Sequence, residues 1–472
     1  MRRKLLILFL LIALVTCGCA PKEKPKRSNH VDLVAWHWLA DRTGAFDVLR
    51  REYESEKQAF NVLSKLYKEV TGVDVKFEFV IRFELYAPTA AYTSKIRAAA
   101  QANKLPEIYG VLMEMRDFAS LIKAGHVLDV TPYMDENNGA WRSTFHKSGL
   151  LMNSFLEDNQ YGVKPGIYGV PIDINNIQFV YNLDLLKKAG WDTTKIPSTW
   201  KDFLALGDAL KKAGIPGLVS GWGESWMIHC MADNFAWNIM GKERILATIK
   251  GEVPYTDPSW VQVFDLFEQM KERGLLSEGI VTMVNKEAEQ TFANERAAIA
   301  FNGSWGVNVY ESMNPDLRYA VGLPPRVNMK NPAYIWGGTT SFVINAKSPL
   351  KEDAVKFLKW LTEERQERFL AENTRNIPAV KGCSDVLQGP AVEFANGMDN
   401  VVHPRLLPIE EYPLVTEAID KGIQSIVIGE ASPEEVAKTV QKTKEEETKK
   451  AQRFKELREK QSKGGESGIP KS

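Results

Sequence analysis

Six tryptophans lie where a predicted strand ends or where glycines interrupt the chain. The chain contains twelve Trp among its 472 residues. A Trp is more often a core residue than a ligand platform, but an indole beside glycines and outside periodic segments favours a surface on which a flat ligand stacks. Other tryptophans fall in helical patterns and are predicted to pack inside, namely Trp200, Trp260 and Trp360. The stacking candidates are Trp36, Trp38, Trp222, Trp226, Trp305 and Trp336.

Polar residues next to these tryptophans are candidates for binding the polar edge of the same ligand. Asp173 can accept charge-assisted hydrogen bonds, and its alternative role is to support a turn. His37 either faces the ligand or caps the end of a strand. Glu114 and Arg116 either border the site or form a surface ion pair. The remaining candidates are Glu224 and Gly337, the latter because backbone at a glycine can approach a ligand closely.

Other chemistries lack the residues that they require. Lys plus Arg number 60 and Asp plus Glu number 60, so the chain has no net positive charge that would attract nucleic acid. The six His are scattered and no metal-ligand spacing occurs, so we predict neither a metal nor a cofactor. A nucleophile elbow and a His-Glu-x-x-His helix are missing from the sequence. Cys230 and Cys383 could pair in an oxidising compartment, but two buried thiols are the simpler expectation.

The N-terminal residues have the pattern of a secretory signal peptide. A basic segment at 2–4 precedes an apolar run at 5–15, which is too short to span a bilayer, and small residues follow at 16–20. Cys19 is typical of a bacterial lipobox, in which the thiol is acylated, and Cys17 is the alternative. Cleavage and release of a soluble protein is the third possibility. We therefore expect an extracytoplasmic protein that is lipid-anchored to the cell membrane.

Strands and helices must position these residues, and the first part of the chain predicts them in alternation. An apolar, β-branched strand is predicted at 31–35 and an alternating one at 73–79, with a helix between them that ends at Gly72. A helix at about 92–102 leads to a third strand near 107–109. This order favours a mostly parallel sheet with helices on both faces. Ligands in such sheets bind at the carboxyl ends of the strands, where Trp36 and Trp38 would lie.

The middle of the chain predicts a second α/β unit of the same kind. The last helix of the chain is predicted to begin with Ser432-Pro433-Glu434-Glu435, a capping box. The charged residues 442–463 in its second half predict a solvated helix that fades into disorder. Helices are predicted at 184–189, from 198, at 258–273, at 285–294 and around 354–361, and strands at 177–182, 296–301 and 337–344.

A series of short motifs, each weak alone, occurs in a familiar order along the chain. Together they resemble the family 1 extracellular solute-binding proteins of bacterial ABC importers, the group that includes maltose-binding protein. The motifs are Ala35-Trp36-His37-Trp38, Leu105-Pro106-Glu107-Ile108, residues 125–133, Tyr168-Gly169-Val170-Pro171, residues 181–190, Pro197-Ser198-Thr199-Trp200, residues 292–299, Asn302-Gly303-Ser304-Trp305, Gly337-Gly338 and residues 352–358.

The resemblance implies an α/β, two-lobed periplasmic-binding-protein fold of type II. Each lobe would be a mixed, mostly parallel sheet flanked by helices, and a hinge of two or three strands would let the lobes close on a ligand. The expected parts are a signal peptide at 1–19, a flexible tether at 20–29, an N-terminal lobe at 30–130 plus 326–378, a C-terminal lobe at 131–325 plus 379–445, and a charged helical to disordered tail at 446–472.

The resemblance also implies a function. A monomeric, non-enzymatic receptor would capture a carbohydrate, foremost an oligosaccharide, between its lobes and deliver it to a membrane permease. In the family, the Trp that ends the Asn-Gly-Ser-Trp motif commonly stacks on sugar, which makes Trp305 the first candidate. A polyol, a glycerophosphodiester or another small solute is the alternative ligand, and a phosphate would require a cluster of Arg or Lys that we cannot assign. A secreted glycoside hydrolase is the remaining alternative, although no segment pairs carboxylates in a catalytic setting.

Overall fold

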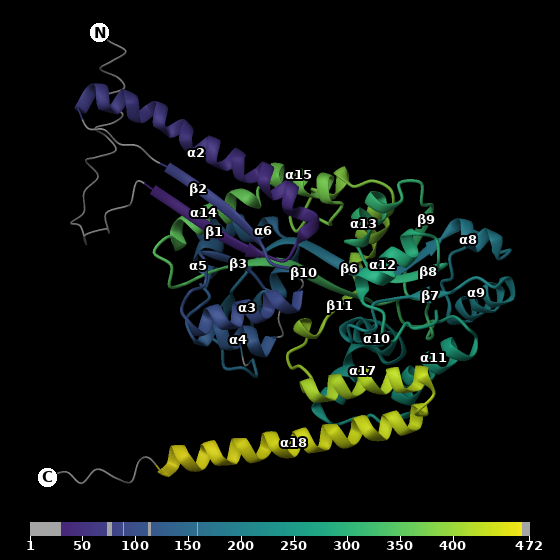
Figure 1. Ribbon diagram of the computed structural model, residues 1–472. Coiled ribbons are helices and arrows are strands. Elements are labelled where there is room, and N and C mark those ends of the chain that lie inside the picture. The colour runs from purple at the N-terminus through teal and green to yellow at the C-terminus, as the bar shows by residue number, and fades with distance from the viewer. Residues whose placement is uncertain (1–29, 73–77, 88, 112–114, 158, 465–472) are drawn as a thin grey trace. The chain divides into compact units, whose positions relative to one another are not determined.

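The computed structural model describes residues 30–72, 78–87, 89–111, 115–157 and 159–464 (Figure 1). The chain divides into two units, which we describe separately, residues 1–32 with 52–81 and residues 33–51 with 82–472. In the smaller unit, the backbone N–H of Ile81 donates to Glu54 Oε1 at 2.8 Å, and His30 Nδ1 lies 3.1 Å from Glu78 Oε2. The candidate site lies in the larger unit.

The strands form one mixed sheet with the order β2-β1-β3-β10-β6-β8-β7, and β9 pairs with β6 and β11 with β10. The pairs β1–β3, β7–β8 and β10–β11 are parallel. The pairs β3–β10, β6–β10, β6–β8 and β6–β9 are antiparallel, which sequence periodicity did not reveal. The strands are β1 (His30–His37), β2 (Glu78–Leu85), β3 (Ile108–Gly110), β6 (Val170–Asn182), β7 (Leu218–Val219), β8 (Ile299–Gly303), β9 (Tyr319–Gly322), β10 (Ile335–Ile344) and β11 (Val401–Val402), with β4 (Ser154–Phe155) and β5 (Gly166–Ile167) as a separate pair.

The helices begin and end where local signals act. Thr199 caps α9 by accepting a hydrogen bond from the Asp202 N–H, and Gly214 ends the same helix in the left-handed conformation. Ser432 and Glu435 form the predicted capping box of α18. The helices are α2 (Thr43–Thr71), α3 (Thr89–Gln101), α4 (Met115–Lys123), α5 (Thr131–Met134), α6 (Glu136–Thr144), α7 (Lys147–Leu151), α8 (Leu183–Lys188), α9 (Trp200–Ala213), α10 (Trp226–Lys250), α11 (Pro258–Glu272), α12 (Asn285–Ala293), α13 (Gly306–Met313), α14 (Lys351–Leu361), α15 (Glu364–Thr374), α16 (Pro390–Asn396), α17 (Pro413–Ile428) and α18 (Pro433–Gly464), with 3-10 turns η1 (Ala40–Arg42), η2 (Ser384–Val386), η3 (Gly397–Asn400) and η4 (Pro404–Leu406).

Two long strands carry the sheet from one side of the larger unit to the other. We call β1 with β3 the first half-sheet and β7, β8 with β9 the second half-sheet; β6 and β10 run through both (Figure 1). Phe179 and Val180 of β6 pack into different core clusters, because successive side chains of a strand point to opposite faces. Both faces of this part of the sheet are therefore covered, and β6 is buried over nearly its whole length.

The packing of residues 155–168 differs from the predicted division into lobes. Phe155, Val163 and Tyr168 lie in one core cluster with Phe118 and with Tyr109 of β3. The prediction assigned residues 131–325 to the C-terminal lobe, whereas these side chains pack with the first half-sheet. β6, which runs through both half-sheets, follows these residues, and the motif order could not locate it. The other predicted domain boundaries stay predictions.

The second strand lies later in the chain than the sequence predicted. The alternating pattern predicted residues 73–79, and β2 spans Glu78–Leu85, while 73–77 lie outside the described residues. The predicted signal peptide, lipobox cysteines and tether also lie outside them. Cys230 and Cys383 are both buried free thiols. In the described part of the chain, none of the helices has the length and apolar character that crossing a membrane requires.

Candidate ligand-binding site

The carboxyl ends of the two half-sheets point toward each other along β6. β3 runs in the direction of β6 because both are antiparallel to β10, and just beyond it the Val111 N–H donates to Ser341 O at 3.1 Å. β8 runs against β6, and at its end the Ser304 N–H donates to Asn176 O at 2.9 Å. Since ligands in open α/β sheets bind at the carboxyl ends of strands, the residues that follow β1, β3, β7 and β8 border one candidate site.

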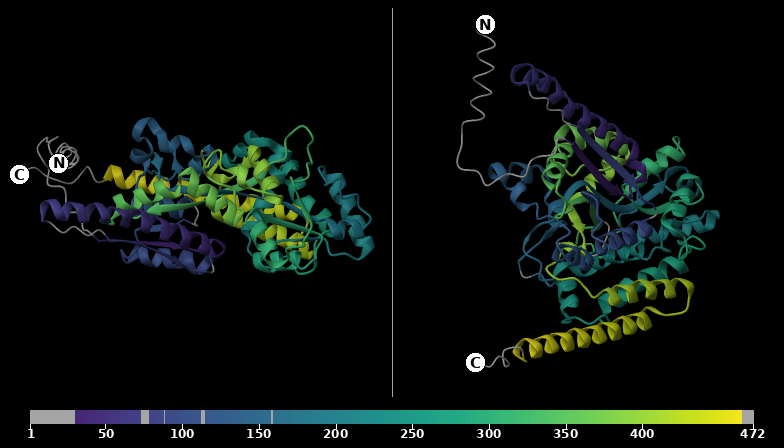
Figure 2. Two further views of the ribbon diagram at one scale, coloured as in Figure 1. Left: turned by 90° about the horizontal axis from the view of Figure 1, so that it is seen from above. Right: turned by 60° about the vertical axis from the view of Figure 1, so that its left-hand side comes forward.

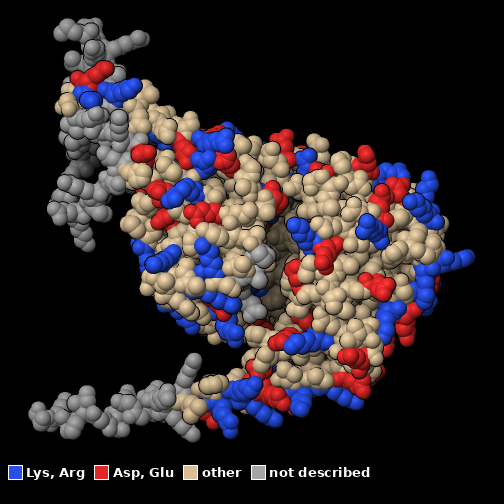
Figure 3. Space-filling model, in the orientation of Figure 1, with Lys and Arg blue, Asp and Glu red and all other residues tan. Residues whose placement is uncertain are grey.

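The register of β6 and β10 gives the size of the gap between these ends. Ser341 pairs with Pro171, so the attachment points on β6 are Pro171 and Asn176. At about 3.3 Å per residue, the two strand ends are roughly 17 Å apart. Figure 3 shows the molecular surface hollowed in the middle of the face that it displays.

Two predicted tryptophans meet at the end of the second half-sheet. Trp305 is the N-cap of α13, directly after β8, and Trp226 is the first residue of α10. Their ring centroids are 6.1 Å apart and the ring planes enclose 47°. Trp226 is 40% exposed and Trp305 is half-buried. Two tilted indoles form a corner that can contact a ligand on two of its apolar faces.

A carboxylate holds the indole N–H of each of these tryptophans. Glu289 Oε1 accepts from Trp305 Nε1 at 3.1 Å and also from the side-chain amides of Asn285 and Asn302, at 2.9 and 3.1 Å. Glu224, a predicted site residue, accepts from Trp226 Nε1 at 3.1 Å. Charge-assisted hydrogen bonds of this kind fix the ring orientation, which reduces the entropy that a ligand must remove on binding.

Sequence reasoning missed Glu289. It is 8% exposed, and burial raises the pKa of its carboxyl, while the bonds from Asn302, Trp305 and Asn285 lower it and the nearby Asp41 carboxylate raises it further. Asp41 belongs to η1, which follows the first half-sheet, so the two sides approach closely enough for their charges to interact. The available signal was a charged residue between Ala288 and Phe292 on the buried side of α12.

The end of the first half-sheet carries an aromatic group that a lysine already covers. Trp36 of β1 packs edge-on against Tyr86, with ring centroids 5.3 Å apart. Lys95 Nζ lies 4.3 Å from the Trp36 ring centroid and 3.7 Å from that of Tyr86, within range of cation–π attraction. A ligand that stacks on the same ring faces must displace this ammonium group.

Trp38 lies flat against the third strand. A Cβ added to Gly110 would meet Trp38 Cζ3 at 2.5 Å, so only a glycine at this position leaves room for the indole. The Trp38 ring also packs against Tyr92, with ring centroids 5.2 Å apart. The ring is half-buried, and its stacking on a ligand stays a prediction.

Comparison with known proteins identifies the family. The family profile of the bacterial extracellular solute-binding proteins matches residues 63–397. The chain belongs to this family. The multiple sugar-binding protein of Streptococcus mutans is 23% identical over 354 residues, which cover 73% of this chain and 78% of that protein. The sn-glycerol-3-phosphate-binding periplasmic protein UgpB of Escherichia coli is 24% identical over 432 residues, covering 86% and 89%.

Solved structures agree on the fold of this solute-binding protein. A chitin oligosaccharide binding protein superposes with a TM-score of 0.69 at 21% identity, covering 89% of this chain and 99% of the other. The fold is thus that of the extracellular solute-binding proteins, and the predicted family and fold class are confirmed. These relatives are described as binding proteins, not as enzymes.

Two predicted contact residues of the solute-binding protein lie in its interior. Trp222 has no exposed surface and packs against Phe267 at 5.7 Å between ring centroids, so the prediction that it stacks on a ligand is wrong. His37 is equally buried, because side chains alternate along β1 and its ring packs against Phe46 at 5.3 Å. Burial, with the charge of Arg42, lowers the pKa of His37 to about 4, and the prediction that it faces the ligand is also wrong.

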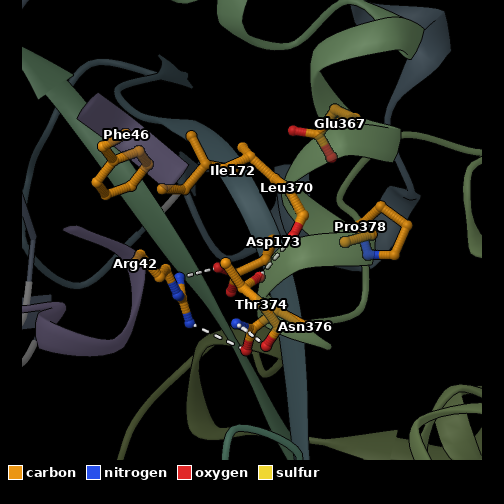
Figure 4. Close-up of a pocket in the computed structure, with 10 residues that line it drawn as sticks. Arg42, Phe46, Ile172, Asp173, Glu367, Leu370, Thr374, Asn376 and Pro378 are labelled. Carbon is orange, nitrogen blue, oxygen red and sulfur yellow. Dashed lines mark hydrogen bonds and ion pairs between the residues drawn. The ribbon is translucent and has the colours of Figure 1, made fainter. Parts of the chain in front are cut away.

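Asp173 takes part in a buried ion pair with Arg42 (Figure 4). Its carboxylate accepts from the Arg42 guanidinium, and Arg42 Nη2 also donates to Asn376 Oδ1 at 3.1 Å. Burial raises the pKa of Asp173 to about 6 although Arg42 lowers it. A small cavity adjoins the pair, lined in part by Phe46 and Glu367. This pairing corrects the expectation that Asp173 is available to ligand hydroxyls.

The remaining predicted residues have other neighbours or lie outside the described parts. Trp336 packs on the His403 ring, with centroids 4.5 Å apart. A Cβ on Gly337 would meet Val401 Cγ1 at 2.7 Å, so packing within the sheet explains this glycine. Glu114 lies outside the described residues. Among the residues that are described, no group of three His, Cys, Asp or Glu is arranged to hold a metal ion.

Proposed function

We propose that this chain is the substrate-binding component of an ABC importer that captures a carbohydrate, foremost an oligosaccharide, between two lobes and delivers it to a membrane permease. The observation that carries the proposal is the pair of facing strand ends, with Trp226 and Trp305 on one side and Trp36 on the other. Sugar rings present an apolar C–H face, for which indole rings are suited, and hydroxyl edges, which carboxylates bind by charge-assisted hydrogen bonds.

The charges at the strand ends favour a neutral guest over a phosphorylated one. Glu224 and Glu289 bond to the indoles of Trp226 and Trp305, the charge of Asp41 acts on Glu289, and Arg42 is already paired with Asp173. A phosphate dianion beside carboxylates would meet like-charge repulsion. Glycerol phosphate, which the relative UgpB is named for, is therefore the second choice.

A thermal-shift screen of the purified protein tests the proposal. The panel contains neutral oligosaccharides, polyols and sn-glycerol 3-phosphate, and a bound ligand raises the melting temperature by mass action. We expect hits among the neutral oligosaccharides, with dissociation constants in the micromolar range, about −8 kcal/mol. A hit with sn-glycerol 3-phosphate alone would refute the sugar assignment and leave the family intact.

Variants of two tryptophans then test the site. Trp305→Ala should weaken binding of the best hit by about tenfold or more, because one stacked ring contributes roughly 1 kcal/mol and the Glu289 hydrogen bond is lost with it. Trp191→Ala is the matched control, since this half-buried indole bonds to Lys195 O in a loop between α8 and α9. Equal affinities for the two variants would exclude Trp305 from the site.

We also propose that the protein is acylated at Cys19, is held at the outer face of the membrane and does not turn over its ligand. Metabolic labelling with a radioactive fatty acid should mark the wild type and Cys17→Ser but not Cys19→Ser. Incubation of the purified protein with the bound oligosaccharide should return it unchanged by chromatography. Cleaved products would favour the hydrolase alternative instead.

A further inference from the structure

Helix α18 has a first half that belongs to the core. Val436, Ala437 and Val440 are at most 3% exposed and pack in the cluster that includes side chains of α11 and α17. Lys444 is 6% exposed, and its Nζ donates to Glu411 Oε1 and to Ile249 O, both at 2.6 Å. Figure 2 shows α17 and α18 as neighbouring yellow helices. The helix is thus fixed to the body of the larger unit up to about residue 444.

The second half of the same helix leaves this support. From Lys449 onward, every side chain whose exposure is described is exposed. Phe454 is 66% exposed and Leu457 is 51% exposed. Residues three apart lie on neighbouring positions of one helix face, so these two large apolar side chains form a short stripe. The stripe is about one turn long on a segment that extends roughly 24 Å from residue 449 to residue 464.

The charge of this half contrasts with that of the whole chain. Residues 449–464 contain seven Lys or Arg and two Glu, a net charge of +5, whereas the net charge of the chain is zero. Lys450 is paired with Glu447 at 2.6 Å, one turn earlier. A helix in which basic residues flank exposed Phe and Leu is typical of segments that lie in a membrane interface.

We propose that residues 449–464 of α18 dock on an anionic lipid surface. Phosphate headgroups complement the cluster of Lys and Arg, and the Phe454 and Leu457 side chains enter the boundary between headgroups and acyl chains. Single exposed apolar residues on a surface need no explanation. Here one helix exposes two of them within a segment whose sequence has a net charge of +5, and a fluid anionic surface satisfies both features without a shaped pocket. The proposal does not depend on the ligand or on acylation of Cys19.

Vesicle co-sedimentation tests this surface directly. The protein is produced from Ala20 onward, so that neither the apolar run at 5–15 nor an acyl chain contributes to binding. Vesicles of phosphatidylcholine with half phosphatidylglycerol are compared with pure phosphatidylcholine vesicles, at low and at high salt. We expect binding to the anionic vesicles only, and a loss of most binding at high salt because screening weakens the attraction.

Three sets of variants assign the binding to α18. Lys449→Gln, Arg453→Gln and Lys460→Gln together should lower partitioning to anionic vesicles at least about tenfold. Each basic residue near such a surface adds a favourable electrostatic contribution to the binding free energy, and the triple variant lacks three of them. Phe454→Ser with Leu457→Ser should also lower partitioning, and the size of this loss should depend less on salt than the loss in the charge variant. The matched control removes three exposed lysines of other helices, Lys187→Gln, Lys201→Gln and Lys212→Gln, and should retain wild-type binding.

Two results would overturn the proposal. One is failure of the wild type to bind anionic vesicles at low salt, which would leave a protein partner or solvent as the environment of this helix. The other is an equal loss of binding in the control and in the α18 charge variant, which would mean non-specific attraction. Unaltered melting temperatures verify that each variant is folded.

Discussion

Replacing Arg42 with Met leaves the Asp173 carboxylate buried opposite an apolar side chain. The side chains of Arg42 and Asp173 are 6% and 5% exposed, and Arg42 also bonds to Asn376. Removing one partner of a buried ion pair costs about 3–5 kcal/mol, because the remaining charge is uncompensated. With an unfolding entropy of about 2.1 cal/mol/K per residue, a folded chain of this size should lose roughly 3–5 °C of melting temperature.

The sign of the pH dependence follows from the raised pKa of Asp173. Its pKa of about 6 lies above the ordinary value of 3.8, mainly because of burial, and loss of the Arg42 charge raises it further. A raised folded-state pKa means that stability is greatest below the unfolded value and falls as pH rises through the folded one. Arg42→Met should therefore be destabilised strongly at pH 8, because the buried Asp173 carboxyl must there either carry an unpaired charge or hold a proton that the unfolded chain releases. At pH 5 the destabilisation should be much smaller, because Asp173 is already largely protonated.

Differential scanning calorimetry at pH 5 and pH 8 measures both effects. The control is Arg51→Met, which removes an exposed ion pair with Asp47 whose arginine side chain is 70% exposed. Exposed pairs contribute at most about 1 kcal/mol, so its melting temperature should change by about 1 °C or less at either pH. A loss for Arg42→Met that is equal at the two pH values, or no larger than the control's, would refute the reasoning.

Three further variants test other parts of the structure. Gly303→Ala should weaken ligand binding as Trp305→Ala does, because its Cβ would lie 2.1 Å from the Trp305 ring and force the indole to move, and calorimetric titration with the best screening hit measures this. Trp222→Ala should cost about 3–5 kcal/mol by emptying a core site, whereas Trp226→Ala should cost less than about 1 kcal/mol, as urea unfolding can compare. Burial raises the pKa of Asp420 to about 7, with His229 lowering it and Asp233 and Glu417 raising it. The folded protein therefore loses stability as pH rises toward 7. The melting temperature of Asp420→Asn, relative to that of the wild type, should be higher at pH 8 than at pH 5.

The sequence predicted the elements of the fold well where local signals are strong. The capping box at Ser432 and the Thr199 cap occur as expected, because such caps depend on side chains within one turn. The antiparallel partners of β6 and β10 did not follow from the sequence, since pairing between strands that lie far apart along the chain leaves no periodic signal. That long-range pairing also decides where the chain crosses between the half-sheets.

The candidate site was predictable in type and only partly in membership. Trp226 and Trp305 come together because each starts a helix directly after a segment that leaves the second half-sheet. His37 and Trp222 have the right residue types at the right ends of strands, but alternation along the strand and core packing turn them inward. Glu289 belongs to no sequence motif. Its role follows only from the three hydrogen bonds that it accepts from N–H groups in different parts of the chain.

The register of the central strands also locates the stretch in which β6 and β10 alone link the two half-sheets. Between Pro171 and Asn176, β6 lies beyond the end of β3 and before the end of β8. It pairs there with β10, and the Ile174 N–H also donates to Ile377 O at 2.9 Å. The pairing shifts register between Thr340 and Ser341 in the same stretch, and such bulges increase local twist. Asp173 lies in this stretch, so the buried Arg42–Asp173 pair ties β6 to the segment after β1, and the neighbouring Ile174–Ile377 bridge ties it to the segment after α15. We therefore expect any motion that brings the two strand ends together to bend β6 and β10 on either side of Asp173 and to leave that buried pair intact.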